Sequence, residues 1–289
     1  MAALRPALTS SAWRRLLQDR VAVGATVTVA LLGLLALLAP LVAPHDPMLT
    51  QLGPVHAAPS VSFILGTDAV GRDCLSRLLW GARVSLPLGL LAVVIAAGLG
   101  TVLGALAGFV GGRLDDTISW LADLFLALPR LVLLLAVMSI AARHGGGRFW
   151  MVAVVLGATG WMPVARLVRG QVLTLRHRPW VLAARSLGLP RARILLRHVL
   201  PWAMPPVMVH ASLMVGGTIL VEAALSFLGL GIPQPTPTWG NMIADGMHSL
   251  ESWWLTLFPG LAITVTVVAF NLLGDSLRDV LDPGLEDPR

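Results

Sequence analysis

Apolar residues fall into six long blocks, and charged residues gather mainly in the stretches between them. The blocks are Val21 to Ala43, Val84 to Val110, Thr117 to Ala142, Phe149 to Ala165, Val199 to Val221 and Ser252 to Gly274. A helix needs about 20 mostly apolar residues to cross the roughly 30 Å hydrocarbon core of a bilayer. The pattern therefore predicts an all-α polytopic membrane protein with about six transmembrane helices.

Composition supports this class, because 56% of the 289 residues are hydrophobic and only 12% are charged, against about 25% charged in soluble domains. The first block follows several arginines and resembles a signal peptide, but Pro44 follows it directly and its length suits a retained anchor. We expect a segment at 1–20, a first transmembrane helix at 21–43, a loop at 44–83, a five-helix core at 84–274 and a tail at 275–289.

The arginines are distributed unequally between the two sides that six helices would define. Residues 1–20, 111–116, 166–198 and 275–289 carry 15 of them, and the opposite loops carry 5. Cytoplasmic loops carry the excess of basic residues, so we predict that both termini and the 166–198 loop are cytoplasmic and that 44–83 is external. Arginines placed between apolar blocks do not indicate nucleic-acid binding.

The lysine and cysteine content limits which reactions and sites this chain can have. The chain has no Lys, and a nucleotide-binding P-loop needs a Lys to reach the β- and γ-phosphates, so any ATP hydrolysis must belong to another chain. The lone Cys74 excludes an intrachain disulfide and a multi-cysteine metal site. We expect no cofactor and no metal in this chain.

Local patterns predict particular contacts. Gly100, Gly104 and Gly108 recur at intervals of four, so they share one helix face and predict a close helix contact. Asp73 is placed to cap a helix beginning at Cys74, and we assign it and its neighbours Asp68 and Arg72 a structural role.

The cytoplasmic segment from Arg178 to Trp202 predicts two short helices. The first would run from Trp180 to Leu187 and end at Gly188, because glycine readily adopts the left-handed cap. Pro190 suits the first turn of a second helix, which we expect to end at Pro201. An amphipathic segment lying on anionic lipid is the alternative.

This segment resembles the EAA loop of bacterial ABC importer permeases, in which an Ala-Ala pair is followed by Gly and later by Leu-Pro. Those places are filled by Ala183, Ala184, Gly188, Leu200 and Pro201, whereas the family's Glu is Leu182. The resemblance implies that the loop docks on an ATPase. Ala183, Ala184 and Leu187 would form the smooth ridge that enters its groove.

Three further motifs resemble the C-type permease of dipeptide, oligopeptide and nickel importers. They are LGTDAVGRDCLSRLLWGARVSLPLGL from Leu65, EAALSFLGLGIPQPTPTWG from Glu222 and AFNLLGDSLRDVLDP from Ala269. The resemblance implies a peptide or nickel importer of the bacterial inner membrane. Its partners would be a second homologous permease, two ABC ATPases, an extracytoplasmic solute-binding protein and the surrounding lipids, with no nucleic acid.

Some questions stay open at this level. Glu222 is a candidate for the translocation path or a gate, but a capping or pairing role fits equally well. A stand-alone secondary transporter is one alternative function, although such carriers place charged coupling sites at mid-membrane. An intramembrane hydrolase built on His210 and Ser212 is another, although adjacent helix positions do not face one another.

Overall fold

The computed structural model describes residues 17–141, 148–247, 249 and 251–281, and its regular elements there are helical. They are α2 (Arg20–Val42), α3 (Cys74–Val110), α4 (Gly112–Leu126), α5 (Arg130–Ala141), α6 (Arg148–Ala158), α7 (Trp161–Leu175), α8 (Pro179–Ser186), α9 (Arg191–Ile194), the π-helical turn η2 (Leu195–Val199), α10 (Leu200–Phe227), α11 (Trp239–Met247) and α12 (Trp254–Leu281). The predicted all-α class is confirmed.

Four helical segments are long and apolar enough to cross a membrane: α2, α3, the run Arg191–Phe227 and α12. Two bent pairs have the required composition when each pair is taken as one span. The break between α4 and α5 bends the path by 94°, and the break between α6 and α7 bends it by 40°. The expected six spans are reached only if each bent pair crosses as a unit.

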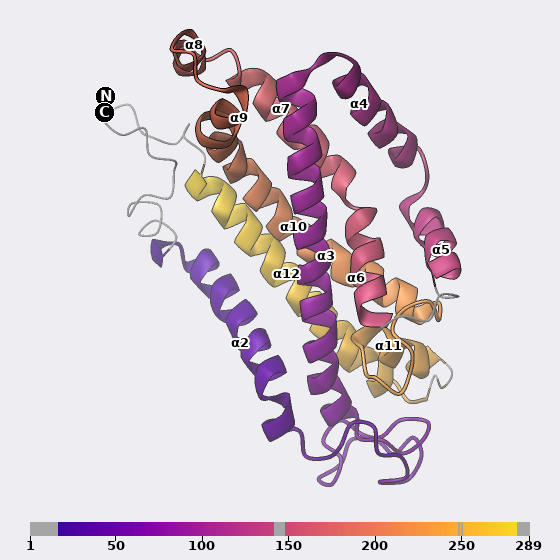
Figure 1. Cartoon of the computed structure of the whole chain (residues 1–289). Helices are drawn as coiled ribbons and strands as arrows, with labels where there is room; N and C mark the ends of the chain where they lie inside the picture. Colours follow the sequence, from indigo (N-terminus) through magenta and orange to yellow (C-terminus); the bar gives the residue numbers. More distant parts are fainter. Residues whose placement is uncertain (1–16, 142–147, 248, 250, 282–289) are drawn as a thin grey trace.

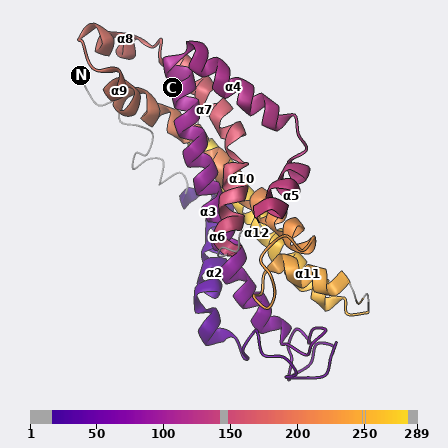
Figure 2. The ribbon, with the colours of Figure 1, turned by 45° about the vertical axis from the view of Figure 1, so that its right-hand side comes forward.

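The long helices lie alongside one another, with non-helical chain and short helices at the ends (Figure 1). The α8 and α9 segment projects from one end, whereas the segment after α2 and helix α11 lie towards the other, as the rotated view in Figure 2 also shows. Ser276 of α12 donates a hydrogen bond of 3.1 Å to Asp19, just before α2. This contact brings the start of the first long helix beside the last helix. Residues 1–16 and 282–289 of the two predicted terminal segments lie outside the described residues.

Helix α3 begins at Cys74, ten residues before the apolar block in which we expected a span. The Asp73 side chain accepts a hydrogen bond of 3.0 Å from the backbone N–H of Ser76, so the predicted cap is confirmed. The expected external loop at 44–83 therefore contains the first turns of α3. Further along the chain, helix α7 continues to Leu175. The first ten residues of the expected 166–198 loop are therefore helical.

The close helix contact predicted for the glycine stripe of α3 is confirmed, and its partner is α7. A Cβ at Gly100 would lie 2.6 Å from the carbonyl oxygen of Trp161, and one at Gly108 would lie 2.9 Å from that of Arg169. Gly104 approaches the backbone of Ala165 in the same way. Real Cβ atoms do not come so close, so glycine is what lets these two backbones meet.

Candidate functional site

The first helix of the α8–α9 segment ends where the sequence predicts. Gly188 has φ +74°, its N–H donates to the Arg185 carbonyl at 2.9 Å, and the Leu189 N–H donates to the Ala184 carbonyl at 3.2 Å. These two bonds form a Schellman cap, in which the left-handed residue is normally glycine. The turn therefore redirects the chain from α8 into α9.

The second predicted helix does not end at Pro201, and that boundary was wrong. Helix α9 passes through η2 into α10, and the Leu200 N–H donates to the Leu195 carbonyl five residues earlier. Proline in a regular helix clashes with the carbonyl four residues before it and cannot donate a hydrogen bond. The wider π turn just before Pro201 accommodates the ring, so the helix continues to Phe227.

The structure divides the predicted ridge into exposed and buried residues. Ala183 is exposed and Leu187 is 78% exposed, whereas Ala184 is 6% exposed. Ala184 packs in a cluster with the buried side chains of Val181 and Ile194. Only Ala183 and Leu187 are therefore free on the outer surface.

The two remaining loop residues lie at its base. Leu200 is partly buried and packs against the same hydrophobic cluster, and Pro201 is also partly buried. Both positions contribute to the junction with α10 rather than to the outer surface.

Three contacts hold the segment on the helix bundle. Arg176 donates from Nη1 to the Gly108 carbonyl of α3 at 2.9 Å. The Arg185 guanidinium lies 5.6 Å from the ring centroid of Phe109, also in α3. Trp180 and Trp202 have ring centroids 6.1 Å apart. These contacts connect the segment from the end of α7 through α8 to α3 and to the start of α10.

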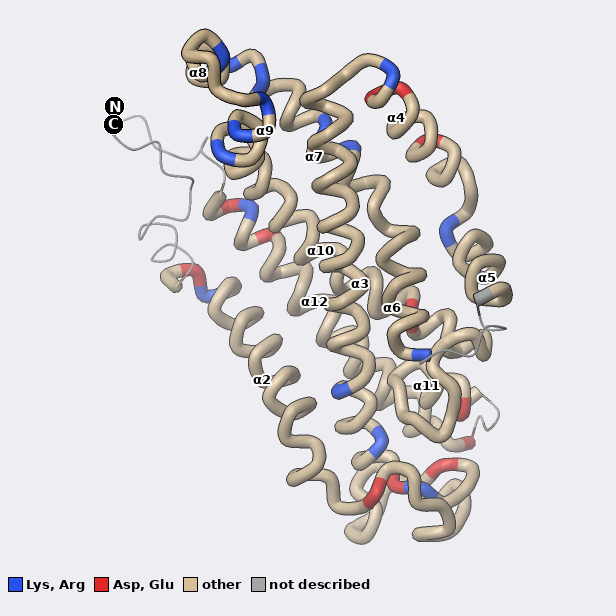
Figure 3. Tube along the Cα trace, in the orientation of Figure 1, with Lys and Arg blue, Asp and Glu red and all other residues tan. Residues whose placement is uncertain are grey.

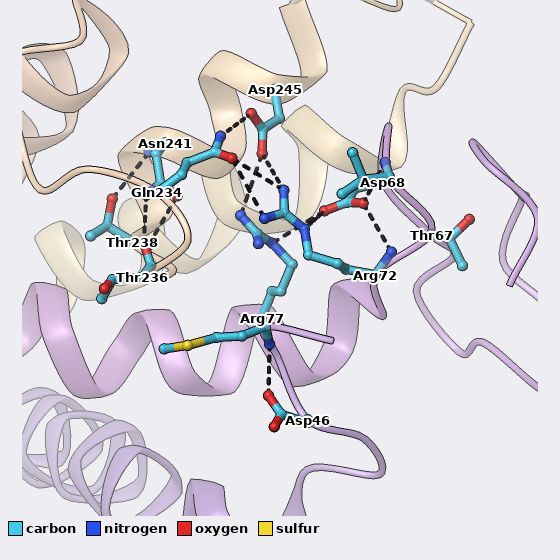
Figure 4. A network of polar contacts seen from close by, with 12 residues as sticks. Asp46, Thr67, Asp68, Arg72, Arg77, Gln234, Thr236, Thr238, Asn241 and Asp245 are labelled. Carbon is cyan, nitrogen blue, oxygen red and sulfur yellow. Dashed lines mark hydrogen bonds and ion pairs between the residues drawn. The ribbon is translucent and has the colours of Figure 1, made fainter. Parts of the chain in front are cut away.

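A second polar site lies towards the other end of the molecule (Figure 4). Arg72 donates from Nε to Asp68 at 2.5 Å, and Arg77 of α3 places Nε 3.5 Å from the same carboxylate. Asp245 of α11 lies 3.5 Å from Arg72 Nη2 and 3.3 Å from Arg77 Nη2. We call Asp68, Arg72, Arg77, Gln234 and Asp245 the ion-pair cluster.

The cluster joins three segments that are distant in sequence. Gln234, in the segment between α10 and α11, donates to Asp245 at 2.7 Å, and Asp68 precedes α3. Burial raises the pKa of Asp245 above its ordinary value, although Arg77, Gln234 and Arg72 act in the opposite direction. The cluster fixes α11 against the start of α3.

Helix α11 has its own N-terminal cap beside the cluster. The Asn241 side chain accepts from the Thr238 N–H at 3.0 Å, while Thr238 Oγ1 accepts from the Asn241 N–H at 3.1 Å. This reciprocal pair resembles a capping box, with Asn in place of Glu.

Sequence reasoning identified part of this site and missed the rest. It assigned Asp68 and Arg72 a structural role, and their ion pair agrees with that assignment. It did not predict Arg77, Gln234 or Asp245, because the partners of Arg77 and Arg72 in α11 lie 168 and 173 residues away. No local spacing connects residues so far apart.

Glu222 is completely buried in α10. Its carboxyl group accepts from Ser226 at 2.7 Å and from Ser85 of α3 at 3.4 Å. Ser85 also accepts from the Trp239 N–H at 3.3 Å, at the start of α11. Glu222 therefore connects α3 and α10 beneath α11, and it does not face an open passage in this structure.

Neither a hydrolytic pair nor a metal centre is assembled in the described part of the chain. Ser212 donates to the Val209 carbonyl at 2.8 Å, and His210 Nε2 is buried without a hydrogen-bond partner there. The described residues contain no group of three or more His, Cys, Asp or Glu side chains placed to hold a metal ion.

Comparison with known proteins identifies the family. The family described as binding-protein-dependent transport system inner membrane component matches residues 100–287. The chain belongs to this family. A second family, the N-terminal TM domain of oligopeptide transport permease C, matches residues 8–59, so the resemblance to C-type permeases is confirmed.

Similar curated proteins carry matching names. The dipeptide transport system permease protein DppC of Bacillus subtilis is 37% identical over 97% of this chain and 88% of its own length. The probable D,D-dipeptide transport system permease protein DdpC of Escherichia coli is 41% identical over 90% and 87%. The glutathione transport system permease protein GsiD of Pectobacterium atrosepticum is 39% identical over 95% and 90%.

Family membership decides between the classes of function left open by the sequence. The chain is a multi-pass inner membrane permease component of a binding-protein-dependent importer, and not an enzyme. The hydrolase alternative is therefore wrong. The stand-alone carrier is also wrong, because this family works in transport systems that depend on a binding protein.

Proposed function

We propose that this permease imports peptides and that the outer surface of α8 receives the motion of an ABC ATPase. The peptide assignment rests on the names of the dipeptide, D,D-dipeptide and glutathione relatives. None of these three names refers to nickel, so we favour peptides over a metal ion.

The proposed docking surface consists of Leu182 and Ala183 on α8 and of Leu187, the residue that caps its C-terminus. Leu182 is 46% exposed and Leu187 is 78% exposed, although both belong to a segment outside the long membrane helices. Exposed apolar side chains on a short helix suit the groove of a partner. This exposure is the observation that carries the proposal.

The coupling route follows the contacts that anchor α8. A push on α8 would reach α3 through Arg176 and Arg185, and it would reach α10 through η2. Because interfaces and packed cores switch between discrete arrangements, a small displacement of α8 can tilt these helices together. The segment would then convert closure of the ATPase into rocking of the spans.

The arginine excess supports a cytoplasmic position for both termini and for α8. In this orientation the ion-pair cluster is external, where it would meet the solute-binding protein. A second homologous permease, two ATPases and the binding protein complete the proposed assembly, and this chain itself needs no cofactor. Glu222 is our candidate gate residue, because it connects α3 and α10 beneath external α11.

The test is Leu187→Arg in the complete importer, expressed with its partner subunits. A charged side chain at the most exposed apolar residue of the proposed contact should reduce retention of the ATPases in detergent extracts at least about tenfold, since a few large side chains carry most of the binding energy of an interface. Uptake of a labelled dipeptide should fall in parallel, while the abundance of the permease stays normal.

The matched control is Val61→Arg, since Val61 is 102% exposed in the segment before α3. It places the same charge on an exposed aliphatic residue at the opposite end, so ATPase retention should not change. Full ATPase retention in Leu187→Arg would disprove the docking surface. If the unaltered importer retains its ATPases but does not take up the dipeptide, the peptide assignment is disproved instead.

A further inference from the structure

A groove with a volume of about 750 Å³ runs between the last turns of α3 and the α8–α9 segment. We propose that it binds an anionic phospholipid of the cytoplasmic leaflet, with the headgroup on its arginines and an acyl chain along α3. The inference uses the orientation given under Proposed function and does not depend on the transported solute.

The groove has a cationic lining. Arg176, Arg185 and Arg191 line it together with His177. Figure 3 shows the basic residues concentrated around α8 and α9, with no acidic residue among them. Three guanidinium groups around one space form a site for a phosphate, which arginine binds through its planar array of donors.

Among the described residues no acidic side chain pairs directly with these arginines, although Arg176 interacts electrostatically with Asp115 at longer range. Arg166 pairs with Asp123, and Arg169 Nη2 donates to Asp115 at 2.8 Å. None of the three groove arginines forms an ion pair within 4.0 Å among the described residues. The sequence explains this, because it contains no Asp or Glu between Asp123 and Glu222.

The three arginines differ in the contacts that their side chains make within the protein. Arg176 holds the Gly108 carbonyl, and Arg185 lies over Phe109. The Arg191 side chain is exposed and makes no hydrogen bond or ion pair within the described part of the chain. Arg191 is therefore the residue most available to a ligand, and its replacement removes no side-chain hydrogen bond or ion pair between described residues.

The groove also has apolar lining residues that belong to a membrane helix. Leu106 is 37% exposed and Val110 is 57% exposed at the end of α3. A phospholipid carries a phosphate next to its acyl chains, which matches the combination of arginines and apolar residues in the groove. An acidic surface of a partner protein would match the arginines but would leave this apolar wall unexplained.

In the proposed orientation the groove lies at the cytoplasmic surface of the membrane, where anionic lipids are present. Negative lipids of the cytoplasmic leaflet attract basic juxtamembrane segments, with roughly 1 kcal/mol for each Arg or Lys near the surface. The groove would add a specific binding site for one lipid to this non-specific electrostatic attraction. A bound lipid would also contact both α3 and the α8–α9 segment, and so it would stabilise the position of this segment on the helix bundle.

The experiment measures lipid binding to the purified full-length chain by native mass spectrometry. Phosphatidylglycerol should bind more tightly than phosphatidylcholine with the same acyl chains. Arg191→Gln should weaken phosphatidylglycerol binding about fivefold and leave phosphatidylcholine binding unchanged. Arg193→Gln is the control, because it removes the same charge from α9 at an exposed residue that does not line the groove.

Several results would overturn the proposal. Equal binding of the two lipids would exclude headgroup selection, and an equal effect of Arg193→Gln would indicate a diffuse surface charge. Displacement of the lipid by millimolar inorganic phosphate would indicate a site for the free ion. Loss of phosphatidylglycerol on addition of the ATPases would assign the groove to a protein partner. None of these measurements involves transport, so they fail independently of the uptake test.

Discussion

The arginines at the two ends of this permease are in opposite environments. In the ion-pair cluster, Arg72 and Arg77 are buried and lie within 3.5 Å of carboxylates on α11 and on the segment before α3. In the α8–α9 segment, Arg185 and Arg191 are exposed and have no acidic partner among the described residues. In the ion-pair cluster, arginine therefore forms ion pairs within the chain. In the α8–α9 segment, it remains available to bind other molecules.

The difference follows from the cost of burying charge. A buried guanidinium must be paired, because removing it from water costs several kcal/mol, and the chain supplies Asp68 and Asp245 where burial occurs. An exposed guanidinium remains hydrated and needs no partner for stability. Substitutions in the ion-pair cluster should mainly affect folding, and those in the α8–α9 segment should mainly affect binding.

The largest effect is expected for Arg77→Met. This change leaves Asp68 and Asp245 with Arg72 as their shared cation, and breaking a buried ion pair costs about 3–5 kcal/mol. We expect roughly 3 kcal/mol, at the lower end, because Arg72 still contacts both carboxylates. Thermal unfolding of the purified protein in detergent measures the loss.

Arg197→Met is the counterpart in the exposed region. Arg197 lies on η2 and is exposed, so its replacement should change the free energy of unfolding by no more than about 0.5 kcal/mol. Similar destabilisation by both substitutions would contradict the contrast between the two regions.

A smaller effect is expected within the α8–α9 segment, where adjacent alanines have different surroundings. Ala184→Leu forces extra volume into the cluster around Val181 and should cost about 1–3 kcal/mol. Ala183→Leu adds the same volume on the exposed side and should be nearly neutral. Limited proteolysis of the segment compares the two variants; equal protection would mean that the two positions have the same environment.

The smallest of the three destabilising effects is expected at the turn between α8 and α9. Gly188→Ala places a Cβ on a residue with φ +74°, which costs about 1–2 kcal/mol, although no atom lies within 4 Å of that Cβ. Gly188→Asn should cost less, because Asn tolerates the left-handed conformation. Proteolytic opening of the segment should rank Ala above Asn above Gly, and an unchanged rate in Gly188→Ala would show that the turn does not limit opening.

Much of this fold follows from local pattern. The apolar blocks predicted the long helices, the spacing of Gly100, Gly104 and Gly108 predicted a close helix contact, and Asp73 and Gly188 predicted where helices begin and end. Each of these signals acts over a single turn or a few turns of helix, so a sequence displays it directly. The π turn at Leu195–Val199 escaped prediction, because Pro201 alone indicates a break and not a wider turn that avoids one.

The sequence by itself determined that this chain is an all-α membrane protein, that it has no P-loop lysine, and that its permease motifs occur in the family's order. These properties depend on composition and on neighbours along the chain. Only the tertiary structure decided which helix meets the glycine stripe, that Ala184 faces inward while Ala183 faces outward, and that Arg77 pairs with Asp245. These results depend on packing between residues far apart in sequence, where many partners satisfy the same local pattern and the geometry of the whole bundle selects one.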